Sequence, residues 1–277
     1  MIERKRVFIT VKTYPTLSEK YDELVCTAGL CEDGSWIRLY PLPFRKLEHE
    51  QTYKKWQWIE IDVERRTQDI RPESYRPLNL DNLVVMATEN KKVDWDERKR
   101  LIFKTEKAFT NKAEIIGLTK TNPPRRTLLT FKPAKIIEFY TQPTERDWPK
   151  EKLDIIKENA KQLSLFQTPD EVIKEFEVVM KLPYEFRYVF TDDEGVESDL
   201  MIEDWEIGAL YCNCLQSAEG NEIVALEKVK QKYWDEFLKK DVFFFLGTRL
   251  RDQHRSPNPF SIVGVFYPPV DKQGRLF

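Results

Sequence analysis

The 277-residue chain has little glycine and almost no histidine, with nine glycines and two histidines. The glycines are scattered, and neither the Walker pattern nor the dinucleotide-binding pattern occurs, which excludes the common phosphate-cradling loops. No nucleophile elbow occurs either. His49 and His254 are too few imidazoles for a histidine-rich metal site. We therefore expect no cofactor and no metal, and the sequence names no reaction.

Cysteines and long apolar runs are also scarce. The four cysteines, Cys26, Cys31, Cys212 and Cys214, form neither a zinc-type pair of pairs nor a secreted disulfide framework, so we expect them to be reduced. No apolar run approaches the roughly 20 residues that cross a bilayer. The first ten residues carry no long apolar stretch after their basic residues. These absences predict a cytoplasmic protein that does not contact a membrane.

Charge is divided unevenly along the chain, although the net charge is only −2. Residues 1–150 hold 29 Lys and Arg against 23 Asp and Glu, whereas residues 151–277 hold 16 against 24. A basic N-terminal part beside an acidic C-terminal part favours a polyanion as the ligand of the first part. The alternative is that the opposite charges help the two parts to dock together.

Alternation with a period of two predicts short strands in the N-terminal part. They cover Arg6–Tyr14, a hairpin over Leu24–Arg45 that turns at Asp33-Gly34, and Trp56–Glu64. Short strands separated by glycine and proline turns over about 80 residues indicate a small barrel, of which the OB fold is the common ligand-binding example.

Helical spacing and further strands alternate in the rest of the chain. An amphipathic helix is predicted over Asp94–Ile116, and other helices are predicted over 149–166, 204–217 and 222–239. Strands are predicted over 127–139, 185–191, 196–202, 242–247 and 261–266, and the last two are apolar enough to be buried on both faces. The expected fold class is α+β, with two β-rich small-barrel (OB-like) lobes elaborated with helices. The expected domains are a basic one over 1–145 and an acidic one over 146–277.

Aromatic and basic side chains share one face of the second strand of the hairpin. Trp36, Arg38 and Tyr40 point to one side of this strand, and Ile37 and Leu39 point to the other. Flat rings stack on unpaired bases while Lys and Arg contact phosphates, so this face predicts a surface for single-stranded nucleic acid. The alternative is that these aromatic residues pack between two domains.

Other candidate contacts are basic residues from both parts of the chain. The turn Asn122–Lys132 is suited to reach a phosphate backbone, and the connection Thr248–Asn258 is a basic island in an acidic region, where a loop is able to carry recognition. The complete set of candidate nucleic-acid contacts is Trp36, Arg38, Tyr40, Arg45, Lys54, Lys55, Arg125, Arg126, Arg249, Arg251, His254 and Arg255.

Two other functions remain open from the sequence. Glu60, Asp62 and Glu64 share a strand face, and Asp204 and Glu206 begin a helix, which are carboxylates of the kind that a metal-dependent nuclease or nucleotide hydrolase uses. The same residues serve equally as a solvent-facing row and, for Asp204, as a helix N-cap. The other hypothesis is a subunit that meets a protein partner through the acidic C-terminal lobe.

Short motifs in both parts resemble one kind of family. Cys26-Thr27-Ala28-Gly29-Leu30 and Asp33-Gly34-Ser35-Trp36-Ile37-Arg38 are similar to the opening of uncharacterised bacterial proteins described as dual OB-containing. Asp204–Gly208 and Phe244–Thr248 also look like segments of such families. The resemblance implies two small barrels and nucleic-acid binding, and it carries over no activity and no catalytic residue.

Overall fold

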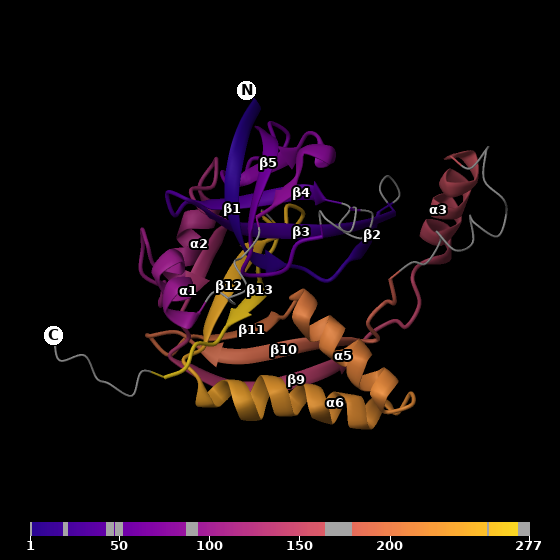
Figure 1. The fold of residues 1–277 in the computed structure, drawn as a ribbon. Coiled ribbons are helices and arrows are strands. Elements are labelled where there is room, and N and C mark those ends of the chain that lie inside the picture. Colours follow the sequence, from indigo (N-terminus) through magenta and orange to yellow (C-terminus); the bar gives the residue numbers. More distant parts are fainter. Residues whose placement is uncertain are drawn as a thin grey trace.

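The computed structural model describes residues 2–18, 22–42, 47, 52–86, 94–163, 179–253 and 255–270. The fold is α+β, and the described strands form a barrel and two smaller sheets (Figure 1). The N-terminal strands are β1 (Ile2–Lys12), β2 (Thr16–Ser18), β3 (Asp22–Cys31), β4 (Trp36–Leu42), β5 (Trp58–Arg65), β6 (Ser74–Pro77) and β7 (Val84–Val85), with a 3-10 turn at Leu80–Asn82.

Five of these strands close into a small barrel that is consistent with an OB-like fold. β3 pairs with β1 and β4, β6 pairs with β4 and β5, and β5 returns to β1. All of these pairs are antiparallel except β4 with β6. The alternation in the sequence fills the interior, since Ile9, Ile37, Leu39, Ile59 and Ile61 are buried. The prediction of a barrel in the N-terminal part is confirmed.

Two glycines allow the hairpin of β3 and β4 to form and to pack on β1. Gly34 has a φ of +88°, in the left-handed region that favours glycine, and the Asp33 Oδ1 atom accepts a hydrogen bond from the backbone N–H of Ser35 at 2.9 Å. At Gly29, a Cβ atom would lie 2.2 Å from the carbonyl oxygen of Phe8. β1 and β3 therefore approach each other closely only because position 29 carries no side chain.

Six further strands build the C-terminal part. Their order is β8–β12–β13 in one sheet and β9–β10–β11 in the other, and a parallel bridge between Ile202 and Ile262 connects the two sheets. The strands are β8 (Leu128–Phe131), β9 (Lys135–Pro143), β10 (Tyr184–Thr191), β11 (Glu197–Met201), β12 (Phe243–Thr248) and β13 (Phe260–Phe266). All of β13 and nearly all of β12 is buried, as the apolar sequence predicts.

Helices accompany these sheets. They are α1 (Trp95–Ile102), α2 (Lys112–Lys120), α3 (Lys150–Leu163), α5 (Trp205–Ser217) and α6 (Glu222–Lys230), the last continuing through a π turn and a 3-10 turn to Lys239. α5 and α6 run along β9 and β10 (Figure 1), where Tyr211 and Val229 join a large aromatic core. None of the described helices combines the length and the apolar character needed to cross a membrane.

The single helix predicted over Asp94–Ile116 is instead two helices. Asp94 caps α1 and Asn111 caps α2, each by accepting a hydrogen bond from a backbone N–H of the following turn. Between them, the backbone N–H of Phe109 donates to the carbonyl of Thr130 at 2.9 Å, and Lys132 donates to Phe109 at 2.8 Å. Bonding to β8 therefore draws this segment out of the helix.

Strand pairing groups the segment before residue 145 with the C-terminal part. β8 pairs with β12, and β9 pairs with β10, whereas the sequence places both segments in a domain that ends at 145. Local patterning does not reveal this grouping, because the partners of β8 and β9 lie far along the chain.

The outer face of β3 and β4 is covered by the C-terminal part. Trp36, Leu30 and Ala28 from the hairpin pack with Phe245 of β12 and Phe266 of β13 in one buried apolar cluster. Figure 1 shows β12 and β13 lying between the barrel and the sheet of β9, β10 and β11. The barrel and the C-terminal part thus share a core.

Candidate functional site

Trp36 and Arg38, the centre of the predicted nucleic-acid surface, lie in this shared core. Trp36 is 7% exposed and Arg38 is 2% exposed. The rings of Trp36 and Phe245 pack edge to face with centroids 5.5 Å apart. The two side chains therefore offer a ligand almost no surface. Trp36 packs between the barrel and the C-terminal part, as the alternative interpretation expects.

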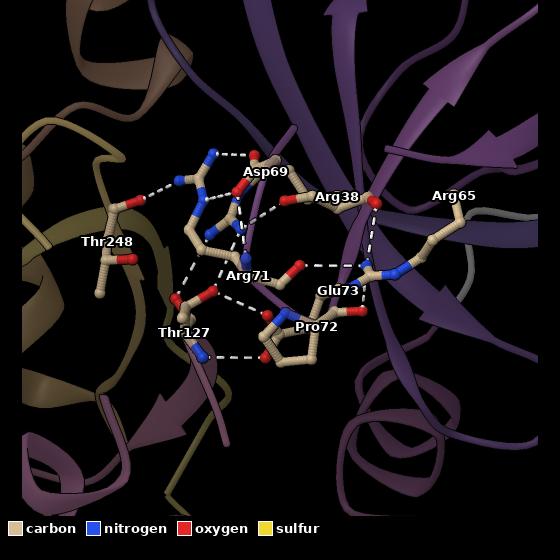
Figure 2. A network of polar contacts seen from close by, with 9 residues as sticks. Arg38, Arg65, Asp69, Arg71, Pro72, Glu73, Thr127 and Thr248 are labelled. Carbon is tan, nitrogen blue, oxygen red and sulfur yellow. Dashed lines mark hydrogen bonds and ion pairs between the residues drawn. The ribbon is translucent and has the colours of Figure 1, made fainter. Parts of the chain in front are cut away.

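Arg38 binds both parts of the protein through a buried polar network, shown in Figure 2. Its Nη1 atom donates to the Oγ of Ser74 at 3.3 Å and to the Oγ1 of Thr127 at 3.1 Å, and its Nη2 atom donates to the carbonyl of Thr127 at 3.3 Å. Burial, and the neighbouring charge of Arg71, lower the pKa of Arg38. Arg38 therefore holds β4 against the start of β8.

Arg71 and Asp69 extend this network to β12. The carboxylate of Asp69 accepts from the Nε atom of Arg71 at 2.9 Å and from its Nη2 atom at 2.6 Å, while Nη1 donates to the carbonyl of Thr248 at 2.6 Å (Figure 2). Burial raises the pKa of Asp69, but the hydrogen bonds and charge of Arg71 outweigh burial and lower it to about 2. The carboxylate is therefore ionised at neutral pH.

Glu73 binds the same loop, residues 66–73, to the C-terminal part. Its carboxylate accepts from the backbone N–H of Thr127 at 2.8 Å, from the Thr127 hydroxyl at 2.7 Å and from the N–H of Leu128 at 3.3 Å. Sequence reasoning missed the roles of Asp69, Glu73 and Thr127. No local signal marks them, because their partners come from distant segments.

Lys55 also joins the two parts instead of facing solvent. Its ammonium lies 2.9 Å from the Oδ2 atom of Asp204 and 2.9 Å from the Oε2 atom of Glu206. Burial opposes the charge of Lys55, but the two carboxylates outweigh burial and raise its pKa. Asp204 also caps α5, by accepting from the N–H of Glu206 at 3.2 Å, so the N-cap alternative is confirmed.

The remaining predicted residues of the barrel are less buried. Tyr40 is half-buried, with the guanidinium of Arg66 5.2 Å from its ring centroid. Lys54 is exposed. Arg45 and His254 lie outside the described residues.

Arg125 and Arg126 line a cavity of about 260 Å³ between the barrel and the C-terminal part, which we call the junction cavity. Arg125 is exposed, and Arg126 lies 2.5 Å from Glu106. Burial raises the pKa of Glu106, and the charge of Arg126 opposes that shift. The cavity is lined by Lys5, Cys31, Ser35, Trp36, Ile37, Pro72, Glu73, Tyr75, Arg125 and Arg126.

The basic loop after β12, which the structure describes at residues 249–253 and 255–256, packs against the end of α2. Lys120 donates through Nζ to the carbonyl of Ser256 at 2.6 Å and to that of Gln253 at 3.2 Å, and Gln253 Nε2 donates to the carbonyl of Thr119 at 2.6 Å. The turn 121–127, which carries Arg125 and Arg126, follows α2 directly. The structure therefore brings together the two basic segments that the sequence singled out.

The arginines of this loop differ in their surroundings. Arg249 is half-buried and paired with Glu203, whose charge helps to raise the pKa of Arg249 against the effect of burial. Arg251 and Arg255 are exposed, and Arg251 lies 3.4 Å from Asp252.

The carboxylate row of β5 is occupied by cations of neighbouring strands. Arg4 lies 3.1 Å from Asp62 and 3.6 Å from Glu60, and Arg76 pairs with Glu64. Within the described ranges, no group of three or more His, Cys, Asp or Glu side chains is arranged to hold a metal ion. The arrangement of this row is that of cross-strand ion pairs.

Comparison with known families divides the chain close to the start of α2. Residues 3–104 match the description "Domain of unknown function (DUF8758)", and residues 108–277 match "Domain of unknown function (DUF8757)". No curated protein matches the chain. The second match spans more than half of the sequence, so the chain belongs to the DUF8757 family.

Proposed function

We propose that this member of the DUF8757 family binds single-stranded nucleic acid at the junction cavity and along the adjacent turn 121–127 and loop 249–256. The observation that carries the proposal is the meeting of cations from distant segments: Lys5 from β1, and Arg125 and Arg126 from the turn, line one cavity. A polyphosphate backbone is the ligand that such a cluster attracts most strongly.

Two of the three cations that line the cavity are paired, Lys5 with Glu3 at 2.6 Å and Arg126 with Glu106 at 2.5 Å, but Arg125 and other cations in or beside the proposed site are available to a new anion. In the described ranges, no carboxylate forms an ion pair with Arg65, Lys120, Arg125 or Arg255. Arg65 donates to backbone carbonyls, among them Ser74 at 3.0 Å, and Lys120 donates to the carbonyls of loop 249–256. A phosphate that approaches these side chains displaces no carboxylate, so the attraction is not offset by a lost ion pair.

Tyr75 provides an aromatic wall for a base. The residue is half-buried and lines the cavity, with the Nζ of Lys5 5.9 Å and the guanidinium carbon of Arg65 5.6 Å from its ring centroid. A base stacked on such a ring contributes about 1–3 kcal/mol, and stacking requires a base that is unpaired. This combination favours a single strand over a duplex.

Strand order supports an OB-like second lobe as well. Counted from first to fifth, the barrel strands are β1, β3, β4, β5 and β6, and the first pairs with the second and the fourth. In the C-terminal part, β8 and β9 taken as one bent strand are the first, followed by β10, β11, β12 and β13, and the first again pairs with the second and the fourth. The third and fifth strands are parallel in both parts, at Arg38–Ser74 in the barrel and at Ile202–Ile262 in the C-terminal part. This equivalence agrees with the resemblance to dual OB-containing proteins.

We further propose a cytoplasmic location. Cys26, Cys31, Cys212 and Cys214 are all free thiols, which accords with a reducing compartment.

Lys5→Ala combined with Arg125→Ala tests the binding site. The variant removes two cations of the cavity, so we expect the dissociation constant for labelled oligothymidylate or oligouridylate to rise at least tenfold at low salt. The slope of log affinity against log salt should fall by roughly 1.4, about 0.7 for each lost phosphate contact. Fluorescence anisotropy across a salt series measures both quantities.

Lys228→Ala combined with Lys230→Ala is the matched control, because these two lysines are exposed on α6. The control should bind as the parent does. Equal binding by the cavity variant and the parent, or no binding by the parent at low salt, contradicts the proposal. Cleavage of the oligonucleotide in Mg²⁺ would point instead to a nuclease.

A further inference from the structure

A second hollow, of about 510 Å³, lies beside β11 in the C-terminal part, and we call it the β11 groove. All of β11 lines one side, and residues 256–261 line the other. β11 pairs with β10 along its length. In the described part of the chain, its only pairing with β13 is the bridge between Ile202 and Ile262. The groove thus lies where β11 and β13, which run parallel at this bridge, move apart.

This gap leaves backbone groups of β11 without a neighbouring strand. The N–H of Ile202 donates to the carbonyl of Phe186 at 2.8 Å, which directs the even-numbered residues of β11 toward β10. The N–H and C=O groups of Glu197, Asp199 and Met201 therefore point to the open edge. Such an edge is a template for another extended chain.

Two side chains already bind carbonyls of this edge. Lys112 Nζ donates to the carbonyl of Glu197 at 2.6 Å, and Arg187 Nη2 donates to that of Asp199 at 3.3 Å. An incoming N–H group would take the place of these donors at the two carbonyls. The edge is thus covered by side chains and not by a strand.

Two of the three cations that line the groove, Arg187 and Arg249, are neutralised by carboxylates, and the third, Lys112, binds the carbonyl of Glu197. Arg187 lies 2.9 Å from the carboxylate of Asp199 and 3.0 Å from that of Glu185, and Arg249 pairs with Glu203. A polyanion would have to separate these pairs. The junction cavity differs, because Arg125 in its lining and Arg65 beside Tyr75 have no carboxylate partner in the described ranges.

Carboxylates, by contrast, are available in the β11 groove. Glu197 is exposed, and no cation of the described chain pairs with its carboxylate. In the same ranges, the ion pair of Asp252 is with the exposed Arg251 at 3.4 Å. An extended chain on β11 would place alternate side chains against these two carboxylates. Charge complementarity therefore selects a basic chain.

We propose that the β11 groove binds an extended, basic segment of a partner protein, which adds a strand to β11. Main-chain hydrogen bonds to Glu197, Asp199 and Met201 supply affinity, and the carboxylates of Glu197 and Asp252 select Lys or Arg at alternate positions. This site shares no residue with the junction cavity, although Arg249, Asp252 and Ser256 of the loop after β12 line the groove. The test therefore reads the amide signals of β11, which belong to the groove and not to the proposed nucleic-acid site.

Nuclear magnetic resonance of the isotope-labelled chain tests this site with a peptide of alternating lysine and threonine as the probe. We expect saturable shifts of the amide signals of Glu197, Asp199 and Met201 as the peptide is added up to about 2 mM. A peptide of alternating glutamate and threonine, and a version of the basic peptide methylated on alternate backbone nitrogens, should leave these signals unchanged.

Glu197→Lys combined with Asp252→Lys should weaken binding of the basic peptide at least tenfold. Both positions are at the surface, so the fold should persist; Glu227→Lys, on the exposed face of α6, is the control and should bind as the parent does. The proposal is overturned if the parent shows no saturable shift, if the methylated peptide binds equally well, or if oligothymidylate shifts the groove signals in place of the peptide.

Discussion

Lys12 is a buried lysine whose surroundings disfavour the charged form of its side chain. It is 7% exposed, and its Nζ atom lies 4.3 Å from the ring centroid of Trp205 and 5.8 Å from that of Tyr53. Burial and the charge of Lys55 lower the pKa of Lys12 to about 7, although the carboxylates of Asp204 and Glu206 act in the opposite direction. An unfolded lysine keeps its proton up to a pH of about 10.4.

The free energy of unfolding should therefore rise with pH between about 7 and 10. In this window the unfolded chain holds a proton that folded Lys12 has released, so higher pH favours the folded state; below pH 7 both states are protonated and the effect of Lys12 is constant. The slope from one such group is at most about 1.4 kcal/mol per pH unit. Lys12→Met should remove this slope in urea unfolding followed at several pH values.

Lys54→Met is the control for this residue, because Lys54 lies close in the sequence but is exposed. It should retain the slope of the parent. Identical pH dependence in the parent and in both variants would show that Lys12 keeps its proton in the folded protein.

At the scale of elements, the loop between β5 and β6, residues 66–73, joins the barrel to the C-terminal sheet. Arg71 donates to the carbonyl of Thr248, and Glu73 accepts from the N–H groups of Thr127 and Leu128. Asp69 holds the guanidinium of Arg71 in place. These backbone positions are the start of β8 and the end of β12. The loop therefore positions the C-terminal sheet on the barrel, and it also shapes one wall of the junction cavity.

Asp69→Asn should destabilise the protein by about 3–5 kcal/mol, because the buried guanidinium of Arg71 loses its counter-charge. The pKa of Asp69 in the folded state lies below its value of about 3.9 in an unfolded chain. The difference between parent and variant should therefore be constant above about pH 4 and shrink as the pH falls toward 2. Urea unfolding across this range measures it.

Glu64→Gln provides the comparison for Asp69→Asn. Glu64 pairs with Arg76 at the surface, with 32% and 54% of their side chains exposed, and such a pair contributes about 1 kcal/mol or less. Equal losses of unfolding free energy in the two variants would mean that the buried pair of Asp69 and Arg71 is no stronger than a surface pair.

Local pattern was enough to predict most of these elements. The segments Val7–Ile9, Ile37–Leu39 and Ile59–Val63 alternate because one side of each strand fills the barrel. β12 and β13 are apolar because both of their faces are covered. The predicted helix over Asp94–Ile116 was wrong in its middle. Its spacing is helical, but β8 offers the backbone of Phe109 better hydrogen-bonding partners.

The candidate site was harder to predict than the elements. Alternation puts Trp36 and Arg38 on the side of β4 that faces away from the barrel core, but it does not say what covers that side. The cover, Phe245 and Phe266, lies some 200 residues later. Likewise, Lys55 and Asp204 are 149 residues apart, so nothing near Lys55 in the sequence reveals a buried ion pair.

For the whole molecule, the shared core predicts that the barrel and the C-terminal sheets unfold together. Phe245 is completely buried between them and contacts Trp36 and Phe266. Phe245→Ala should cost about 3–5 kcal/mol. It should also accelerate hydrogen exchange in β3 and in β12 by the same factor, because one cooperative opening exposes both.

Ile223→Ala serves as the control for Phe245→Ala, since Ile223 is 72% exposed and its loss should change neither strand. Faster exchange in β12 alone would mean that the barrel keeps its structure without the C-terminal sheet.

The packing of β12 and β13 on the outer face of β3 and β4 also has a consequence for synthesis on the ribosome. The barrel strands emerge before Phe245 and Phe266, which lie far behind them in the sequence. At a rate of about 5–20 residues per second, the nascent barrel waits roughly 10–30 seconds with its apolar outer face unprotected. Ribosomes stalled before β12 should therefore carry a chain that recruits chaperones, and completion of β13 should release them.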